Sequence, residues 1–192
     1  SRSNPRTCQT PRPDSRWVAL EQAMVAFVNS VNQSHGAERV AVVTFSSDNY
    51  NPCGETNTEA SVDQDLTENL NDVRRAMRSR SNSIWNGMTN IDAGIRAAHD
   101  LLTGPSARTY ADKVMIVLTD GVYTGSDPEP DAQDANDDHI TIHTITFSDG
   151  ANQSDMQRVA SAGQGRHYHA PDAASLEDVF SELAAVVSIL TN

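Results

Sequence analysis

The run Val114-Met115-Ile116-Val117-Leu118-Thr119 is almost entirely apolar and leads directly into Asp120 and Gly121. Apolar side chains at successive positions, rather than at alternate ones, are typical of a strand buried on both faces of a sheet. A sheet is covered on both faces mainly when its strands run parallel and helices connect them. The stretch therefore predicts an α/β fold, with the carboxylate of Asp120 at the C-terminal end of a buried strand.

The remainder of the chain alternates between strand and helix patterns. The run 39–45 is again continuously apolar, whereas 60–66 has the weak, polar alternation of an edge strand. Strands joined by helices predict one α/β domain over residues 1–192, with a mainly parallel sheet. The other predicted elements are strands at 140–147 and 166–169 and helices at 17–31, 68–80, 91–102 (with Asn90 as N-cap), 155–162 and 176–190.

Charge and hydropathy exclude several classes of partner. The 192 residues include 26 acidic and 14 basic side chains, which gives a formal net charge of −12. Nucleic acids and anionic membrane surfaces attract basic proteins, so neither is expected to bind this chain. No apolar run approaches the length of a membrane-spanning helix, so this segment is not expected to insert into a bilayer.

The two cysteines, Cys8 and Cys53, both lie in loop-like sequence rich in Pro, Gly or Asn. Two cysteines exclude a four-cysteine metal site. One disulfide between loops, formed in an oxidising compartment, is the expected arrangement, and two independent free thiols are the alternative.

Hydroxyl and carboxylate side chains collect where a ligand is expected to bind in a parallel α/β sheet, beyond the carboxyl ends of the strands. Ser1 and Ser3 precede the first predicted helix, Thr89 lies in the loop before the helix at 91–102, and Asp120 ends the strand quoted above. These hard oxygen donors suit a divalent cation such as Mg²⁺.

The motifs Ser1-x-Ser3, Gly87-x-Thr89-Asn90 and Thr119-Asp120-Gly121, in this order, resemble the metal-ion-dependent adhesion site of von Willebrand factor type A domains. The resemblance extends to the order of helices and strands along all 192 residues. It implies a three-layer α/β/α, Rossmann-like fold with one antiparallel edge strand. It also implies that Ser1, Ser3, Thr89 and Asp120 bind Mg²⁺, or Mn²⁺ or Ca²⁺, and that a partner protein supplies a carboxylate to the metal.

The chain departs from the family pattern at its first residue. The family's first aspartate precedes the first serine by two residues, and the first central strand lies further upstream, whereas this chain begins at Ser1. We therefore expect a piece of a larger protein that lacks one acidic ligand and one core strand. The strands on either side are then expected to pair with each other or to leave a gap, and affinity for Mg²⁺ is expected to be weak.

Each candidate residue also has a structural interpretation. Ser1 and Ser3 can be frayed terminal residues, Thr89 can cap a helix, and Asp120 can be an ordinary turn residue. Asp92 is expected to stabilise the helix dipole or the site loop rather than to bind metal. The acidic stretch 127–138 lacks the spacing of a calcium-binding loop and predicts a solvated loop leading into a short helix.

The resemblance favours a non-catalytic, metal-dependent protein-binding module. The chain is similar to domains of bacterial surface proteins and of tight-adherence (Flp-type) pilus-assembly proteins, and this similarity implies an extracellular or periplasmic location. Two alternatives remain: a metal-assisted hydrolase that uses Asp120 with His167 or His169, and an intracellular partner of a chaperone-like ATPase. The hydrolase is disfavoured because no G-x-S-x-G, P-loop or H-E-x-x-H motif is present.

Overall fold

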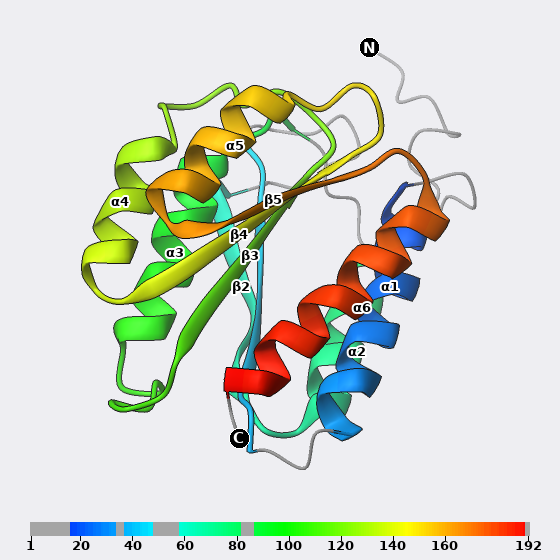
Figure 1. Ribbon diagram of the computed structural model, residues 1–192, viewed down its shortest axis with the longest axis vertical. Coiled ribbons are helices and arrows are strands. Elements are labelled where there is room, and N and C mark those ends of the chain that lie inside the picture. Colours follow the sequence, from blue (N-terminus) through cyan, green and yellow to red (C-terminus); the bar gives the residue numbers. More distant parts are fainter. Residues whose placement is uncertain (1–15, 34–36, 48–57, 82–86, 191–192) are drawn as a thin grey trace.

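The computed structural model describes residues 16–33, 37–47, 58–81 and 87–190. The predicted metal ligands Ser1 and Ser3, and the predicted disulfide partners Cys8 and Cys53, lie outside these residues. Helices and strands alternate along the described part of the chain, as the sequence predicts (Figure 1). In chain order they are α1 (Arg16–Gln33), β1 (Val40–Phe45), β2 (Ala60–Thr67), α2 (Leu70–Ser81), α3 (Ile91–Thr103), β3 (Lys113–Thr119), α4 (Glu129–Asp137), β4 (Ile140–Phe147), α5 (Gln153–Ala162), β5 (Gln164–Ala170) and α6 (Ala173–Leu190).

The strands form two hydrogen-bonded groups. Strands β3, β4 and β5 make a parallel sheet with β4 in the middle, and its register pairs Lys113 with Ile140. Strands β1 and β2 pair antiparallel in a separate two-stranded sheet, in which Phe45 faces Ala60. Within the described ranges, no ladder joins β1 to β3. The predicted α/β fold with parallel strands is therefore confirmed, but the antiparallel pair stands apart from the parallel sheet.

Helices cover both faces of the strands (Figure 1). On one side, α1, α2 and α6 pack over a core that includes Val42 of β1 and Ile145 of β4, so this core spans both sheets. Phe27 of α1 and Phe180 of α6 meet edge to face at its centre, with ring centroids 5.8 Å apart. On the other side, α3, α4 and α5 enclose a second core with β3 and β4. Buried apolar surface on both faces holds the two sheets in one molecule.

A buried ion pair joins α2 to the hairpin formed by β1 and β2. Arg80 donates from Nε to Oδ2 of Asp63 at 2.8 Å and from Nη2 to the other carboxylate oxygen. The hydroxyls of Thr44 and Ser61 each donate to the same carboxylate at 2.9 Å. The side chains of Arg80 and Asp63 are only 13% and 9% exposed, so the network is largely shielded from water.

The polar strand β5 is longer than the predicted strand at 166–169, and it lies very close to β4. A Cβ atom at Gly165 would overlap the carbonyl oxygen of Ile142, so only glycine permits this approach. The acidic stretch after β3 forms α4, where Ala132 and Ala135 face the core, Asp131 is partly buried, and Asp134 and Asp137 are exposed. The described residues contain no helix long and apolar enough to span a membrane.

Candidate metal centre

Asp120 lies where the sequence places it, directly after β3 at the carboxyl end of the parallel sheet. Its carboxylate is about half exposed, and Oδ2 accepts a hydrogen bond of 2.9 Å from Nη1 of Arg16, the first residue of α1. The same guanidinium nitrogen lies 3.5 Å from the backbone carbonyl oxygen of Asp120. The carboxylate is therefore accessible and already attracts a positive charge, which are two properties that a cation ligand requires.

The loop that carries Thr89 is tied to the loop that follows β3. The backbone N–H of Thr89 donates to the hydroxyl of Thr124 at 3.0 Å, and the N–H of Thr124 donates to the carbonyl of Thr89 at 2.8 Å. A Cβ atom on Gly121 would lie 3.1 Å from Oγ1 of Thr89, so the threonine hydroxyl rests against the residue after Asp120. The fold thus brings the hydroxyl of Thr89 to the segment that carries Asp120.

The N-cap residue of α3 is Asn90 and not Thr89. This position agrees with the prediction from the sequence, but the side chain of Asn90 makes no capping hydrogen bond. Its Oδ1 is buried without a hydrogen-bond partner, as is Oδ1 of Asp92. A Cβ atom at Gly125 would lie 2.4 Å from Oδ1 of Asn90 and 2.6 Å from Oδ1 of Asp92. The side chains of Asn90 and Asp92 therefore lie against the loop after β3.

Asp92 is almost completely buried in the first turn of α3. Its Oδ2 accepts from Nη1 of Arg96 at 2.8 Å, and the same nitrogen lies 3.3 Å from a carboxylate oxygen of Asp131 in α4. Burial raises the pKa of Asp131, the carboxylates of Asp92 and Asp134 raise it further, and Arg96 opposes them. Asp92 thus belongs to an ion-pair network that links α3 to α4 through Arg96, and its expected role in stabilising the helix dipole or the site loop stays a prediction.

Two serines that the motif does not include also adjoin the Thr89 loop. Ser46 and Ser47 follow β1, and the hydroxyl of Ser47 accepts from the N–H of Met88 at 2.8 Å. Gly87 has a φ of 156°, and a Cβ there would collide with Oγ of Ser46 and lie 2.8 Å from Oγ of Ser47. Their position after a buried strand was the signal available in the sequence, but Met88 follows Ser47 by 41 residues.

The histidines considered for catalysis are engaged elsewhere. Nδ1 of His167 lies 2.9 Å from the hydroxyl of Thr144, and Nδ1 of His169 lies 3.0 Å from the hydroxyl of Thr146. Burial lowers the pKa of His167, and the neighbouring His169 lowers it further. These contacts hold β5 against β4. The described residues contain no group of three or more His, Cys, Asp or Glu side chains that could hold a metal.

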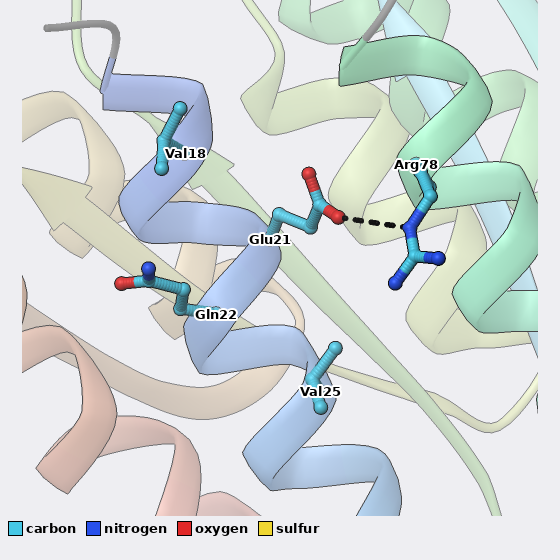
Figure 2. A pocket seen from close by; sticks show the side chains of 5 residues that line it. All are labelled: Val18, Glu21, Gln22, Val25 and Arg78. Carbon is cyan, nitrogen blue, oxygen red and sulfur yellow. Dashed lines mark ion pairs between the residues drawn. The ribbon is translucent and has the colours of Figure 1, made fainter. Parts of the chain in front are cut away.

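A shallow hollow between α1 and α2 is separate from this site (Figure 2). None of its lining residues belongs to the predicted metal site, and an ion pair of 3.7 Å between Glu21 and Arg78 crosses it. The residues that line it are Val18, Glu21, Gln22, Val25 and Arg78.

The donor set suits a hard divalent cation but supplies only part of a coordination sphere. Thr89 offers a hydroxyl and Asp120 a carboxylate, whereas Mg²⁺ takes six oxygen ligands and usually keeps several waters. The accessible carboxylate of Asp120 and the adjacent threonine hydroxyl fit such an ion. Water and further oxygen ligands would have to complete the coordination sphere.

The sequence profile of the von Willebrand factor type A domain matches residues 13–182, and the chain therefore belongs to this family. The family resemblance read from the motifs is thus confirmed. Among curated protein sequences, none matches the chain.

Solved structures share the fold at low sequence identity. The pilus adhesin SpaC from Lactobacillus rhamnosus GG matches with a TM-score of 0.72 and 17% identity, over 91% of this chain and 28% of its own. A von Willebrand factor type A structure from Catenulispora acidiphila has a TM-score of 0.70 and 20% identity, over 92% and 39% of the two chains. Proximal thread matrix protein 1 from the mussel byssus, solved with a zinc-occupied adhesion-site motif, matches with a TM-score of 0.69 and 20% identity. The match covers 90% of this chain and 40% of its own. This chain thus spans less than half the length of each of these proteins.

Proposed function

We propose that this domain is a non-catalytic, metal-dependent protein-binding module. Asp120 and Thr89 hold a divalent cation together with Ser1 and Ser3, and a carboxylate of a partner protein completes the coordination. The observation that carries the proposal is the contact between the Thr89 hydroxyl and Gly121, which brings two donors of the motif to one edge of the sheet. Structures with the same fold include a pilus adhesin and a matrix protein with zinc in the corresponding motif, which is compatible with such a role.

The donors explain why a partner's acid is needed. A divalent cation held by one carboxylate and several neutral hydroxyls keeps net positive charge and attracts an external carboxylate. Asp120 supplies the charge, Thr89 supplies a neutral oxygen, and Gly121 leaves room between them because it has no side chain. The surrounding chain carries a net charge of −12 and repels acids, so binding of the partner should require the cation. Mg²⁺ is the proposed ion, with Mn²⁺ or Ca²⁺ as substitutes.

We also propose that a strand upstream of residue 1, in a larger protein, lies between β1 and β3. Within the part of the chain that the structure describes, no strand ladder joins β1 to β3. Such a strand would complete the three-layer α/β/α domain and end in the family's first aspartate. A bacterial cell-surface or pilus-assembly protein, with Cys8 bonded to Cys53, is the proposed setting.

Titration calorimetry with MgCl₂ and MnCl₂ tests the metal site. The chain should bind weakly, and a version extended upstream by the missing strand and aspartate should bind more tightly. Thr89→Ala and Asp120→Ala should abolish the heat of binding, whereas Asp178→Ala, at an exposed position of α6, should not. Unchanged affinity in Asp120→Ala would refute the site, and equal affinity of both chain lengths would refute the missing ligand. A partner retained from a cell-surface extract only in the presence of Mg²⁺ would support the protein-binding role.

A further inference from the structure

Three arginines lie side by side on the outward face of α2, although the chain as a whole has a net charge of −12. Arg74 and Arg75 each precede Arg78 by one helical turn, so their side chains share one face of the helix. Together with Asn71 they line one hollow. The side chains of Arg75 and Arg78 are 72% and 73% exposed, so a partner can reach their guanidinium groups. The opposite face of α2 is buried through Leu70, Val73, Ala76 and Met77.

Neutral side chains orient Arg74. Its Nη1 donates to Oδ1 of Asn71 at 2.8 Å, and its Nη2 donates to Oδ1 of Asn29 in α1. These amide oxygens fix the position of the guanidinium group without neutralising its charge. Like charges one turn apart destabilise a helix, so α2 holds Arg74 and Arg78 together at a cost. A role in binding an anionic group explains why the charges are kept together.

Two valines of α1 adjoin the arginines. Val18 and Val25 are about two helical turns apart, so they lie on the same face of α1, and they line the hollow that Arg78 also lines (Figure 2). The buried face of α1 is formed by other residues, which are Ala23, Phe27, Val28 and Val31. The valine hollow and the arginine hollow meet at Arg78. The surface formed by Val18, Val25, Arg74, Arg75 and Arg78 is called the α1–α2 groove below.

The charges of the α1–α2 groove favour an acidic partner. Its three arginines are opposed by the carboxylates of Glu21 and Asp72, which form ion pairs with Arg78 and Arg75. The ion pair between Glu21 and Arg78, at 3.7 Å, is longer than a hydrogen bond, so an incoming carboxylate can compete for this guanidinium group. Because the chain as a whole is acidic and repels such a partner elsewhere, an acidic segment is directed to this surface.

We propose that the α1–α2 groove binds an amphipathic helix of a partner protein that carries Asp or Glu along one flank of its apolar face. The apolar side chains pack on Val18 and Val25, and the acidic flank pairs with the arginines of α2. A helix fits this surface because it presents apolar and charged side chains at the same spacing of one and two turns. The interaction needs no cation, so it goes beyond the proposed metal-dependent function and is independent of it.

A second copy of this chain is a poorer occupant of the groove. It carries the same net charge of −12 and is repelled at long range. Two carboxylates of its acidic helix α4 are already engaged, because Glu129 pairs with Arg158 and Asp131 pairs with Arg96.

Three two-heptad peptides test the proposal on the whole chain by NMR titration in EDTA. The first contains two repeats of Ala-Leu-Glu-Ala-Leu-Glu-Ala, the second has Gln in place of Glu, and the third has Ala in place of Leu. The first should shift the backbone amides of Val18 and Val25 and the Nε–H signals of Arg75 and Arg78. The second and third should bind about tenfold more weakly, because one lacks the charges and the other lacks the apolar side chains. Equal affinities for the first two peptides, or no shifts at these groups at millimolar concentration, would overturn the proposal.

A matched pair of arginines provides the control. Arg78→Gln should weaken binding of the first peptide about threefold, whereas Arg166→Gln should leave it unchanged. Both arginine side chains are 73% exposed and both pair with a glutamate, but Arg166 lies on β5. An equal effect of the two substitutions would contradict the proposed surface. Since the titrations are made in EDTA, failure of the metal site would leave these results unchanged.

Two further measurements decide between occupants. In sedimentation equilibrium the chain alone should remain a monomer up to millimolar concentration, and self-association that Arg78→Gln abolishes would assign the groove to a second copy. A short DNA duplex should bind more weakly than the first peptide, and tighter binding of the duplex through the same arginines would assign the groove to nucleic acid. Either of these results would overturn the proposal.

Discussion

Replacing Arg80 by methionine tests how the β1–β2 hairpin is attached to the rest of the domain. This hairpin shares no described ladder with the parallel sheet, so its position depends on α2, α3 and the ion pair between Arg80 and Asp63. Methionine keeps an unbranched apolar stem but removes the charge and the donors. Asp63 would then remain buried, with only the hydroxyls of Thr44 and Ser61 as donors.

The expected cost follows from the burial of the pair. Removing one partner of a buried ion pair leaves an uncompensated charge and typically costs about 3–5 kcal/mol. Arg80→Met should therefore lower the free energy of unfolding by that amount at pH 7. The double variant Arg80→Met with Asp63→Asn should recover at least about 2 kcal/mol, because a neutral amide oxygen still accepts from the two hydroxyls.

Urea unfolding followed by circular dichroism measures these differences in the free energy of unfolding. The slope of that free energy against urea concentration must be the same for all variants. Arg75→Met in the same helix is the matched control, because its partnership with Asp72 is at the surface, with side-chain exposures of 72% and 28%. It should cost no more than about 1 kcal/mol. A cost below about 1 kcal/mol for Arg80→Met, or no recovery in the double variant, would refute the view that this network is shielded from water.

Three further outcomes are expected. Burial lowers the pKa of His167 in the folded state, so the unfolded chain binds a proton more readily. The free energy of unfolding should therefore fall as the pH drops below about 6.5. In urea titrations between about pH 5 and 7, His167→Gln should make the free energy of unfolding less dependent on pH. Gly165→Ala should destabilise the domain by about 2 kcal/mol, because its methyl group meets the carbonyl oxygen of Ile142, and an unchanged melting temperature would contradict this. Arg16→Gln should tighten Mn²⁺ binding about threefold in calorimetry, since the guanidinium competes for Asp120, whereas weaker binding would show that Arg16 assists the metal.

Four strands could be predicted from the sequence, the polar β2 among them, whereas only part of the polar strand β5 could. The predicted strand at 140–147 coincides with β4, whose side chains are buried almost throughout and four of whose eight residues are isoleucine or phenylalanine. Strand β5 has the sequence Gln-Gly-Arg-His-Tyr-His-Ala, and its stability comes from hydrogen bonds to β4 and to the threonines there. Contacts of that kind leave no local pattern, so the strand was predicted too short.

The site shows the same division. Thr89 and Asp120 stand out because short motifs mark them, and the structure places the Thr89 hydroxyl against Gly121. That they bind a cation stays a prediction. The pairing of Arg16 with Asp120 spans 104 residues of sequence, and no local signal reveals it. The expected N-cap position of Asn90 is confirmed, but its side chain makes no capping hydrogen bond.

The division of the strands into two sheets also has a consequence for how the domain opens. Strand β4 has a partner on each side, whereas β1 is paired only with β2 among the described elements. Amide protons of β1 and β2 should therefore exchange with solvent through local openings of lower free energy than those that expose β4. An upstream strand seated between β1 and β3 would be bonded to both groups. It would merge two cooperative units into one, so that the segment that supplies a metal ligand would also make unfolding a single transition.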